Sequence, residues 1–355
     1  MSTVNSCFKI AERSIGPEHP PYCIAEVGIN HNGDIDIAKR MILVAKQANA
    51  DAVKFQTFKA AEFCGDAGQM FTYKSKGKIV TEPMIEMFER YEFNTDQWYE
   101  IKKYCDINEI KFLSTPQNRS DLDLLIDLGI PAIKIGSDDL TNLPLIKDYA
   151  STNLPLILSC GMADMGEVHQ ALECGGFYNN KSVALLLCTS QYPTPLHDVN
   201  LRKITTLRAA YPGLVVGFSD HTQGQLSAGM SVALGASIFE KHFTLSHDYF
   251  GPDHWFSEEP NELNMWVNTV KNAYIALGNG MILPTSSELD MRLLARRSIV
   301  ALKEITKGEK IDATNIGLKR PGGGLPPVLI SEIYGLHAAT KISKGSKINF
   351  RDLCP

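Results

Sequence analysis

The chain has 355 residues, and 35 Lys and Arg against 40 Asp and Glu give a formal net charge of −5 at pH 7. A surface that follows nucleic-acid phosphates usually carries a basic excess, so this balance argues against a nucleic-acid partner. Hydrophobic residues make up 44% and charged residues 21%, which is typical of a folded globular protein and not of a disordered chain.

The beginning of the chain, MSTVNSCFKIAERSIG, lacks the apolar core of a signal peptide, and no stretch approaches the roughly 20 apolar residues of a membrane span. We therefore expect a cytoplasmic protein with no membrane partner. Eight cysteines are present without a Cys-x-x-Cys pair, and Cys23, Cys160 and Cys188 lie in or beside apolar runs. We expect small buried side chains, with a zinc cluster or a catalytic thiol as the less favoured alternative.

Short apolar runs alternate with longer segments up to about residue 280. In the first long segment Ile37, Met41, Val44 and Ala48 recur at helical spacing. Strands are predicted at residues 22–27, 52–56, 111–115, 132–135, 156–159, 183–188, 215–219 and 238–243. Eight alternations of strand and helix predict an α/β fold, a (β/α)8 TIM barrel, with a doubly wound open sheet as the structural alternative.

The composition and the length of the chain indicate more than one domain. Three regions are predicted: a barrel domain at residues 1–282, a linker at 283–295 and a small C-terminal domain at 296–355. The stretch from Gly278 to Glu288 is rich in Gly, Pro and Ser, as linkers are. The C-terminal part has β-type runs at 298–302 and 338–342. About 60 residues give a small core, so we expect this domain to lean on another surface.

Every predicted strand ends in polar or ionisable residues, where a barrel places its chemistry. In chain order these are Glu26; Lys54 and Gln56; Ser114 and Thr115; Lys134 and Ser137; Ser159; Ser190 and Tyr192; Ser219 and His221; Glu240 and His242. Two lysines and several hydroxyls at one mouth suit a small anion such as phosphate or carboxylate. The alternative for Lys54 and Lys134 is a salt bridge to Glu26 or Glu240 inside the barrel.

His221 and His242 end neighbouring strands, so their imidazoles can share one divalent metal ion and leave positions open for substrate. Hydrogen-bonded structural histidines are the alternative. Gly251 to His254 forms a predicted tight turn that carries Asp253 over the mouth. Lys319 to Gly324 places a cation on a glycine-rich loop that either approaches an anion or is simply a mobile basic turn.

Taken together and in order, these strings resemble the sialic acid synthase family, whose members make nine-carbon keto sugar acids. The matching segments are IAEVGINHNGD from Ile24, VKFQTF from Val53, STP from Ser114, KIGSDDLTN from Lys134, LSCGM from Leu158, CTSQYPTP from Cys188, GFSDHT from Gly217, EKHFT from Glu240, GPDH from Gly251, RRS from Arg296 and KRPGGG from Lys319. The family joins a barrel to an antifreeze-like (SAF) domain that reaches over the partner subunit in a domain-swapped homodimer. The resemblance implies the same fold and dimer here, with Arg320 entering the partner's site.

The family reaction condenses phosphoenolpyruvate with an open-chain N-acetylmannosamine-type sugar and releases phosphate. By this resemblance, phosphoenolpyruvate would be held by Lys54, Thr115, Lys134, Ser137, Ser159, Ser190 and Ser219. The sugar would be contacted by Gln56, Asp139, Tyr192 and Arg320. The catalytic group would comprise Glu26 and Asp253 as candidates for proton transfer, together with His242. His221 and His242 would bind Mn²⁺ or Mg²⁺ as the metal cofactor.

The acceptor sugar and the reaction type each have alternatives. Members specific for N-acetylmannosamine often have Asn at the position of Ser190 and a Ser-Gly-Glu string at Ser137 to Asp139; the residues found here also resemble legionaminic and pseudaminic acid synthases, whose sugars carry a second acetamido group. A Schiff-base aldolase using Lys134 or Lys54 would be a different enzyme on the same fold. A non-catalytic sugar-acid sensor would be a different class of protein.

Overall fold

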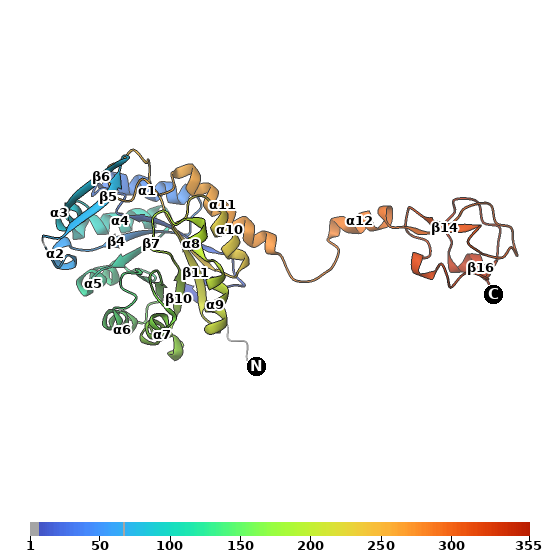
Figure 1. Ribbon diagram of the computed structural model, residues 1–355, viewed down its shortest axis with the longest axis horizontal. Helices are drawn as coiled ribbons and strands as arrows, with labels where there is room; N and C mark the ends of the chain where they lie inside the picture. Colours follow the sequence, from blue (N-terminus) through green and yellow to red (C-terminus); the bar gives the residue numbers. More distant parts are fainter. Residues whose placement is uncertain (1–6, 67) are drawn as a thin grey trace. The chain divides into compact units, whose positions relative to one another are not determined.

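The computed structural model describes residues 7–66 and 68–355, and the chain divides between Gly278 and Asn279 into two compact units (Figure 1). The first unit is built around eight parallel strands. They are β3 (Tyr22–Gly28), β4 (Ala52–Thr57), β7 (Lys111–Pro116), β8 (Ile133–Ile135), β9 (Leu156–Ser159), β10 (Val183–Leu187), β11 (Val215–Asp220) and β12 (Ile238–His242). All eight predicted strands are therefore present.

The strands are hydrogen-bonded in the order β7-β4-β3-β12-β11-β10-β9-β8, and the two end strands β7 and β8 lie beside each other. No backbone ladder joins β7 to β8 in the part of the chain that the structure describes. The sheet nevertheless curls round on itself, and this arrangement confirms the predicted TIM barrel over the doubly wound open sheet. Helices follow the strands around the outside, as in the α/β barrels generally (Figure 1).

The helices of the first unit begin and end as follows: α1 (Ile35–Gln47), α2 (Ala60–Phe63), α3 (Met84–Glu89), α4 (Thr95–Ile107), α5 (Arg119–Asp127), α6 (Leu143–Ser151), α7 (Met165–Cys174), η1 (Phe177–Asn179), α8 (Leu196–Val199), α9 (Arg202–Ala210), α10 (Leu226–Ala233) and α11 (Pro260–Leu277). Side-chain caps define several starts. Asp34 accepts hydrogen bonds from the first-turn amides of α1, and Asn94 and Gln97 form a reciprocal capping box at the start of α4.

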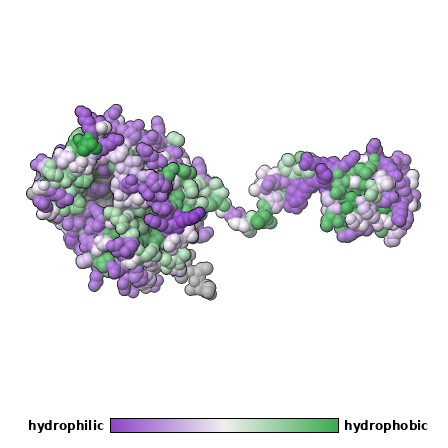
Figure 2. Space-filling model, in the orientation of Figure 1, coloured by the Kyte–Doolittle hydropathy of each residue, from purple (hydrophilic) through white to green (hydrophobic). Residues whose placement is uncertain are grey.

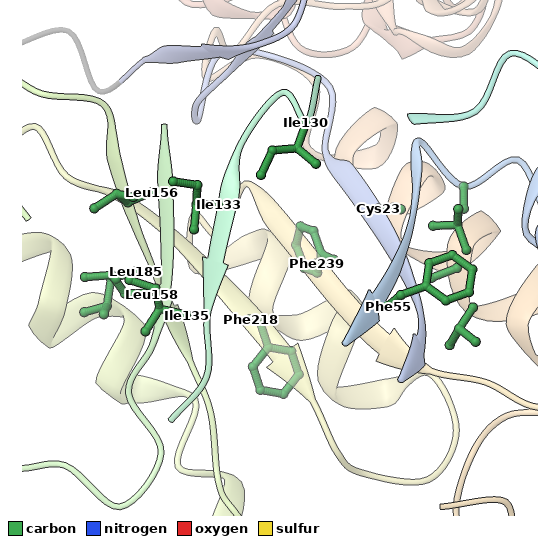
Figure 3. Packing of buried hydrophobic residues seen from close by; sticks show 14 of the residues in the cluster. Cys23, Phe55, Ile130, Ile133, Ile135, Leu156, Leu158, Leu185, Phe218 and Phe239 are labelled. Carbon is green, nitrogen blue, oxygen red and sulfur yellow. The ribbon is translucent and has the colours of Figure 1, made fainter. Parts of the chain in front are cut away.

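Side chains alternate between the two faces of each strand, and this alternation separates two cores. On β3, Cys23 and Ala25 join the large apolar layer between the sheet and the helices, whereas Tyr22 and Ile24 join a smaller cluster inside the barrel. Figure 3 shows members of the outer layer, such as Phe218 on β11. The next inward position on β3 is Glu26, so the inner face turns from apolar to polar along the strand.

A short antiparallel hairpin, β1 (Phe8–Ile10) with β2 (Arg13–Ile15), packs against the apolar cluster inside the barrel. Its residues Phe8, Ile10 and Ile15 are buried together with Ile24 and Ile238. The hairpin therefore fills the barrel end opposite the polar strand ends. The sequence analysis did not predict it, because only three residues form each strand.

A second hairpin lies in the long connection from β4 to β7, between α2 and α3. Its strands are β5 (Met70–Ser75) and β6 (Lys78–Pro83), and the figure shows this group at one side of the first unit (Figure 1). The segment has its own small apolar cluster, in which Phe58, Tyr73, Met87 and Tyr91 are buried. The sequence analysis did not predict this hairpin either.

The second unit contains α12 (Ser286–Ala295), β13 (Ser298–Ala301), β14 (Ile316–Lys319), η2 (Pro327–Leu329), β15 (His337–Ala338), η3 (Phe350–Asp352) and β16 (Leu353–Cys354). Its core consists of ten buried residues, most of them isoleucines, among them Ile299, Ile316 and Ile348. The segment predicted as a linker, 283–295, holds α12, none of whose side chains is buried. The space-filling view shows apolar residues on the surface of this unit as well as polar ones (Figure 2).

All eight cysteines are free, and Cys23, Cys160 and Cys188 are buried, as expected. No group of three or more His, Cys, Asp or Glu side chains able to hold a metal ion is found among the residues described. Across the same residues, no helix is both long and apolar enough to cross a bilayer.

Candidate active site

A cavity of about 330 Å³ opens at the C-terminal ends of the barrel strands. It is lined by Glu26, Lys54, Gln56, Phe58, Phe63, Phe88, Thr115, Gln117, Lys134, Gly136, Ser137, Asp138, Ser159, Met162, Cys188, Ser190, Tyr192, Ser219, His221, Glu240 and His242. Twelve residues that the sequence analysis selected are on this wall. They are Glu26, Lys54, Gln56, Thr115, Lys134, Ser137, Ser159, Ser190, Tyr192, Ser219, His221 and His242.

The floor of the cavity is a buried array of two lysines and two glutamates. Lys54 Nζ lies 2.7 Å from Glu26 Oε2 and 3.6 Å from Glu240 Oε2. Lys134 Nζ lies 3.9 Å from Glu240 Oε1 and donates a hydrogen bond to Ser159 Oγ at 2.8 Å. The lysines therefore form the salt bridges that the sequence analysis gave as the alternative, and they also line the cavity, where anion binding stays a prediction.

The pKa values of the two glutamates of the floor are shifted in opposite directions. Burial raises the pKa of Glu26 to about 7, and Lys54 offsets only part of this effect. Burial also acts to raise the pKa of Glu240, but Lys134 and Lys54 outweigh it and hold the pKa at about 2. Glu240 is thus a fixed negative charge, whereas Glu26 can take up and release a proton near neutral pH.

Beside the floor, the backbone amide of Gly161 lies close to the hydroxyl groups of Ser137 and Ser190. The Gly161 amide donates a hydrogen bond to Ser137 Oγ at 3.0 Å. A Cβ atom at Gly161 would lie 2.3 Å from Ser190 Oγ and 2.7 Å from Ser137 Oγ, so no larger residue fits without a shift. We call Ser137, Ser159, Gly161 and Ser190 the serine cradle. Its hydroxyls and the nearby Lys134 are the kind of donors that bind phosphate or carboxylate oxygens.

The two histidines lie next to each other at the wall, with ring centroids 5.5 Å apart. His221 Nδ1 is 2.8 Å from the carbonyl oxygen of Thr189, to which it donates a hydrogen bond, so in the neutral form of His221 the lone pair is on Nε2. Tyr192 covers His221, with the two ring centroids 4.1 Å apart. Burial and the charge of His221 keep the pKa of His242 well below its usual value, so His242 is neutral.

His221 has the hydrogen bond that is typical of a metal ligand, whereas, among the described residues, His242 does not. A metal-bound histidine usually donates its other N–H group to a carbonyl or carboxylate, as His221 does to Thr189. His242 Nδ1 is buried, has no hydrogen-bond partner among residues 7–66 and 68–355, and lies 4.0 Å from Asp253 Oδ2. Cys188 and the Thr189 carbonyl raise the pKa of His221 although burial acts against this, so a metal ion would compete with a proton there.

Gly28 brings the possible proton-transfer groups together. A Cβ atom at this position would lie 3.4 Å from Glu26 Oε1, 3.6 Å from Asp253 Oδ2 and 3.6 Å from His242 Cε1. Gly28 also has φ of +54°, which side chains other than glycine rarely adopt. Burial raises the pKa of Asp253 to about 6. Asp253 therefore lies beside His242 and Glu26, although it does not line the cavity itself.

One predicted sugar contact of the barrel does not line the cavity. Asp138, not Asp139, is on the cavity wall, while Asp139 accepts a hydrogen bond from Asn142 Nδ2 at 3.0 Å. Arg320, another predicted sugar contact, belongs to the second unit. Glu240 lines the cavity as well; the sequence analysis placed it at a strand end but gave it no role in catalysis or binding. Cys188 also lines the cavity and was predicted only as a small buried side chain. A two-residue step along the strand would have indicated its position, since Cys188 follows the inward-facing Leu186 by two residues.

Behind the histidines, a buried ion-pair network ties the ends of β11 and β12 to α11. Lys241 Nζ lies 3.4 Å from Asp220 Oδ2 and 3.2 Å from Glu258 Oε1. Trp266 on α11 donates a hydrogen bond from Nε1 to Asp220 Oδ2 at 2.9 Å. Because Asp220 and Lys241 precede His221 and His242 in the chain, this network fixes the backbone that carries the two imidazoles.

The fold and cavity define a TIM-barrel protein with a buried floor of lysines and glutamates and a C-terminal SAF domain, the latter matched by the SAF domain model over residues 296–353. The NeuB family model matches residues 41–282. The chain belongs to the NeuB family, the group of sialic, legionaminic and pseudaminic acid synthases, as the sequence motifs predicted.

Two curated relatives and one solved structure illustrate this membership. The N,N'-diacetyllegionaminic acid synthase of Legionella pneumophila is 38% identical, over 92% of this chain and 93% of that protein. The N-acetylneuraminate-9-phosphate synthase of Homo sapiens is 32% identical, over 95% and 93%. A crystal structure of the N-acetylneuraminic acid synthetase of Leptospira borgpetersenii, in complex with citrate, is 31% identical, with a TM-score of 0.72 over 82% of this chain and 96% of that one.

Proposed function

We propose that this protein condenses phosphoenolpyruvate with an open-chain 2-acetamido sugar of the mannosamine type, giving a nine-carbon 2-keto-3-deoxy sugar acid and phosphate. The observation that carries the proposal is that three features line one cavity: Lys54 and Lys134 of the floor, which we call the lysine floor, the serine cradle, and the neighbouring His221 and His242. The names of the relatives support the proposed product class, because these relatives are synthases of diacetyllegionaminic acid and N-acetylneuraminate-9-phosphate.

In the proposed complex, Lys54 and Lys134 balance the negative charge of phosphoenolpyruvate, and the serine cradle, with Thr115 and Ser219, donates hydrogen bonds to its oxygens. Thr115 Oγ1 accepts a hydrogen bond from Lys54 Nζ at 3.3 Å, which leaves its own O–H group to donate to the ligand. Ser219 Oγ donates to Glu240 Oε1 at 3.0 Å, so its hydroxyl would turn to reach phosphoenolpyruvate. The lysines and Thr115 lie at the floor before the reaction begins, which lowers the cost of reorganising them around the developing charge.

The reaction forms a bond from carbon 3 of the enol to the aldehyde carbon of the sugar. A water oxygen then joins carbon 2, and the carbon–oxygen bond to phosphate breaks. The former aldehyde oxygen gains a proton and the water loses protons. Glu26 is the proposed carrier, because its pKa of about 7 allows both states, and Asp253, with a pKa of about 6, is the second candidate.

We propose that His221 and His242 hold Mn²⁺ or Mg²⁺, with substrate and water completing the coordination. When bound, such an ion would supply Lewis-acid polarisation of the sugar aldehyde. Gln56 and Tyr192 line the same cavity and are the proposed sugar contacts of the barrel. Tyr192 also packs its ring on His221, so it would orient the imidazole and the acceptor at once.

A 2,4-diacetamido hexose is the second candidate acceptor. Two observations favour it: the identity of 38% to a diacetyllegionaminic acid synthase exceeds the 32% to the human N-acetylneuraminate-9-phosphate synthase, and Asp138 and Ser190 line the cavity at positions where the chain departs from the mannosamine pattern.

We also propose a domain-swapped homodimer in which Arg320 reaches the sugar in the partner's cavity. Helix α12 supports this proposal, because it exposes Leu289, Met291, Leu293 and Leu294, which a partner surface would cover. Arg320→Ala should impair use of the sugar without unfolding the barrel. Mixing inactive Arg320→Ala and His242→Ala variants should restore about a quarter of wild-type activity, because half of the exchanged dimers would hold one intact site.

Phosphate release after subunit exchange measures this recovery, and mass spectrometry under native conditions confirms that mixed dimers formed. Mixed dimers without recovered activity would show that Arg320 acts within its own subunit or does not act at all. Two variants of His242 and His221 mixed together serve as the control, because both damage the barrel site and should not complement each other.

The affinity for phosphoenolpyruvate should depend on pH through Glu26. Below its pKa of about 7 Glu26 is neutral, so the two lysines exceed Glu240 by one charge; above it, ionised Glu26 cancels that excess. We expect affinity to fall about tenfold as the pH rises through 7. Calorimetric titration of Glu26→Gln should show a much smaller change, because glutamine does not ionise. The ligand's own titration is common to both proteins and cancels in the comparison.

A phosphate-release assay tests the function directly. It combines phosphoenolpyruvate with a panel of mono- and diacetamido hexoses, with and without chelator, and we expect release that requires both an acceptor and a metal ion. A Schiff-base aldolase would instead be inactivated by borohydride with a keto substrate and be indifferent to chelator, a possibility to which the lowered pKa of the buried Lys134 lends weight. A sugar-acid sensor would bind its ligand and release no phosphate.

A further inference from the structure

One part of the cavity wall has no task in binding phosphoenolpyruvate. Phe58, Phe63 and Phe88 come from the connection between β4 and β7 and line the same cavity as the lysine floor. Their rings contact one another, with centroids 6.2 Å apart for Phe58 and Phe63, 5.2 Å for Phe58 and Phe88, and 5.0 Å for Phe63 and Phe88. We call these three residues the aromatic wall.

The aromatic wall is not simply core. Phe58 is buried, but Phe63 and Phe88 are only partly buried, and what they leave uncovered faces the cavity. Most of the other residues around this cavity are charged or hydroxyl-bearing. Phosphoenolpyruvate is anionic at both ends, so its place is the lysine floor, and three phenylalanines add nothing to that interaction. Apolar surface in a polar cavity indicates an apolar part of a second ligand.

The topology places the aromatic wall across the mouth from Ser190 and Tyr192 and on the same side as Gln56, which belongs to β4. The wall follows β4, whereas Ser190 and Tyr192 follow β10. In the strand order around the barrel, β4 and β10 are four steps apart in either direction, so they are opposite each other. An acceptor that reaches the floor between them has Tyr192 and Ser190 on one side and the phenyl rings on the other.

We propose that the aromatic wall is a subsite for the second acylamino group of the acceptor, and that it makes the enzyme prefer a 2,4-diacetamido hexose to a 2-acetamido hexose. The inference rests on the proposed function. A methyl group of an acetamide packs on phenyl rings without leaving a polar atom unpaired, whereas a free hydroxyl placed against the same rings loses its hydrogen bonds with water. Both effects favour the acylated sugar.

The expected preference for the diacetamido sugar can be estimated from the effect of one methyl group in other hydrophobic pockets. A single methyl or methylene group in a hydrophobic pocket changes specificity by roughly 10- to 200-fold. We therefore expect the wild-type protein to use the diacetamido sugar with kcat/KM at least about tenfold above that of the monoacetamido sugar of the same configuration.

The test measures steady-state kinetics of phosphate release for both acceptors in the full-length protein and four variants. Phe63→Ala and Phe88→Ala remove wall surface, Phe88→Leu keeps an apolar side chain, and Phe71→Ala is the matched control. Phe71 lies on β5, is 37% exposed, stacks on Tyr73 and does not line the cavity. In the two alanine variants, we expect the ratio of kcat/KM for the diacetamido sugar to kcat/KM for the monoacetamido sugar to fall about tenfold. The fall should come from a higher KM for the diacetamido sugar. KM for phosphoenolpyruvate should stay within about twofold, Phe88→Leu should lie between, and Phe71→Ala should match the wild type.

Each outcome separates the two proposals. An unchanged preference in folded Phe63→Ala and Phe88→Leu proteins, with phosphate still released, overturns the subsite and leaves the proposed function in place. Equal losses for both acceptors also overturn it, because they show a general effect on the cavity. No phosphate release by the wild type with any acceptor overturns the proposed function and the subsite with it. Circular dichroism identifies a variant that fails to fold, and Phe88→Leu then supplies the answer.

Discussion

His242→Ala should abolish metal-dependent phosphate release, lowering kcat/KM by about 10³-fold, because a bound metal ion supplies several kcal/mol of charge stabilisation. His242 is neutral, has a buried Nδ1 without a partner, and lies beside His221, so it is the residue whose imidazole is most available to a metal ion. Titration with Mn²⁺ followed by electron paramagnetic resonance should show weakened binding in the same variant.

His197→Ala is the control for this experiment. His197 is exposed on α8 and does not line the cavity, so its removal should change neither Mn²⁺ binding nor turnover. A His242→Ala protein with normal rates that still respond to chelator would show that the metal ion, if needed, is held elsewhere. Normal Mn²⁺ binding with lost turnover would instead assign His242 to proton transfer or to positioning.

Lys134→Met should weaken phosphoenolpyruvate binding by about 100-fold, the value of one charged hydrogen bond to an anion of about 1.5 to 3 kcal/mol. The variant should also unfold at a lower temperature, because Glu240 then keeps only Lys54 as a cation within ion-pair distance. Removing one partner of a buried ion pair commonly costs about 3 to 5 kcal/mol. Calorimetric titration and thermal unfolding measure the two effects.

The double variant Lys134→Met with Glu240→Gln separates binding from stability. Glutamine removes the uncompensated charge, so the unfolding temperature should recover while phosphoenolpyruvate affinity should not. Recovery of both would mean that Lys134 acts on the fold alone and that the anion binds elsewhere. Borohydride trapping in the wild type that is lost in the single variant, with no phosphate released by either protein, would favour the Schiff-base alternative.

The barrel strands and most of the cavity wall could be predicted because both follow from local patterns. Apolar runs bounded by polar residues marked the strands, and Glu26, Lys54 and Lys134 stood at the ends where a barrel gathers its polar groups. Glu240 was placed at a strand end and recognised as a possible salt-bridge partner, but its task in the cavity was not predicted. Cys188 was missed as a wall residue, although it follows the inward-facing Leu186 by two positions and the inner face alternates with the outer one.

Other parts of the site depend on contacts between residues distant in the chain. Gly161 lies between Ser137 and Ser190 only after three loops have folded together, and no local pattern shows this. The aromatic wall was missed for a related reason. The β5–β6 hairpin, which has exposed apolar residues, separates Phe58 and Phe63 from Phe88. The segment therefore lacks the regular spacing of apolar residues that indicates which side chains face inward.

The β1–β2 hairpin closes one end of the barrel. Phe8, Ile10 and Ile15 fill the opening at the N-terminal ends of the strands, while the cavity opens at the C-terminal ends. In the proposed complex, phosphoenolpyruvate on the lysines would lie deeper than a sugar held between Tyr192 and the phenylalanines. On this proposal we expect phosphoenolpyruvate to bind before the sugar and phosphate to leave after the sugar acid.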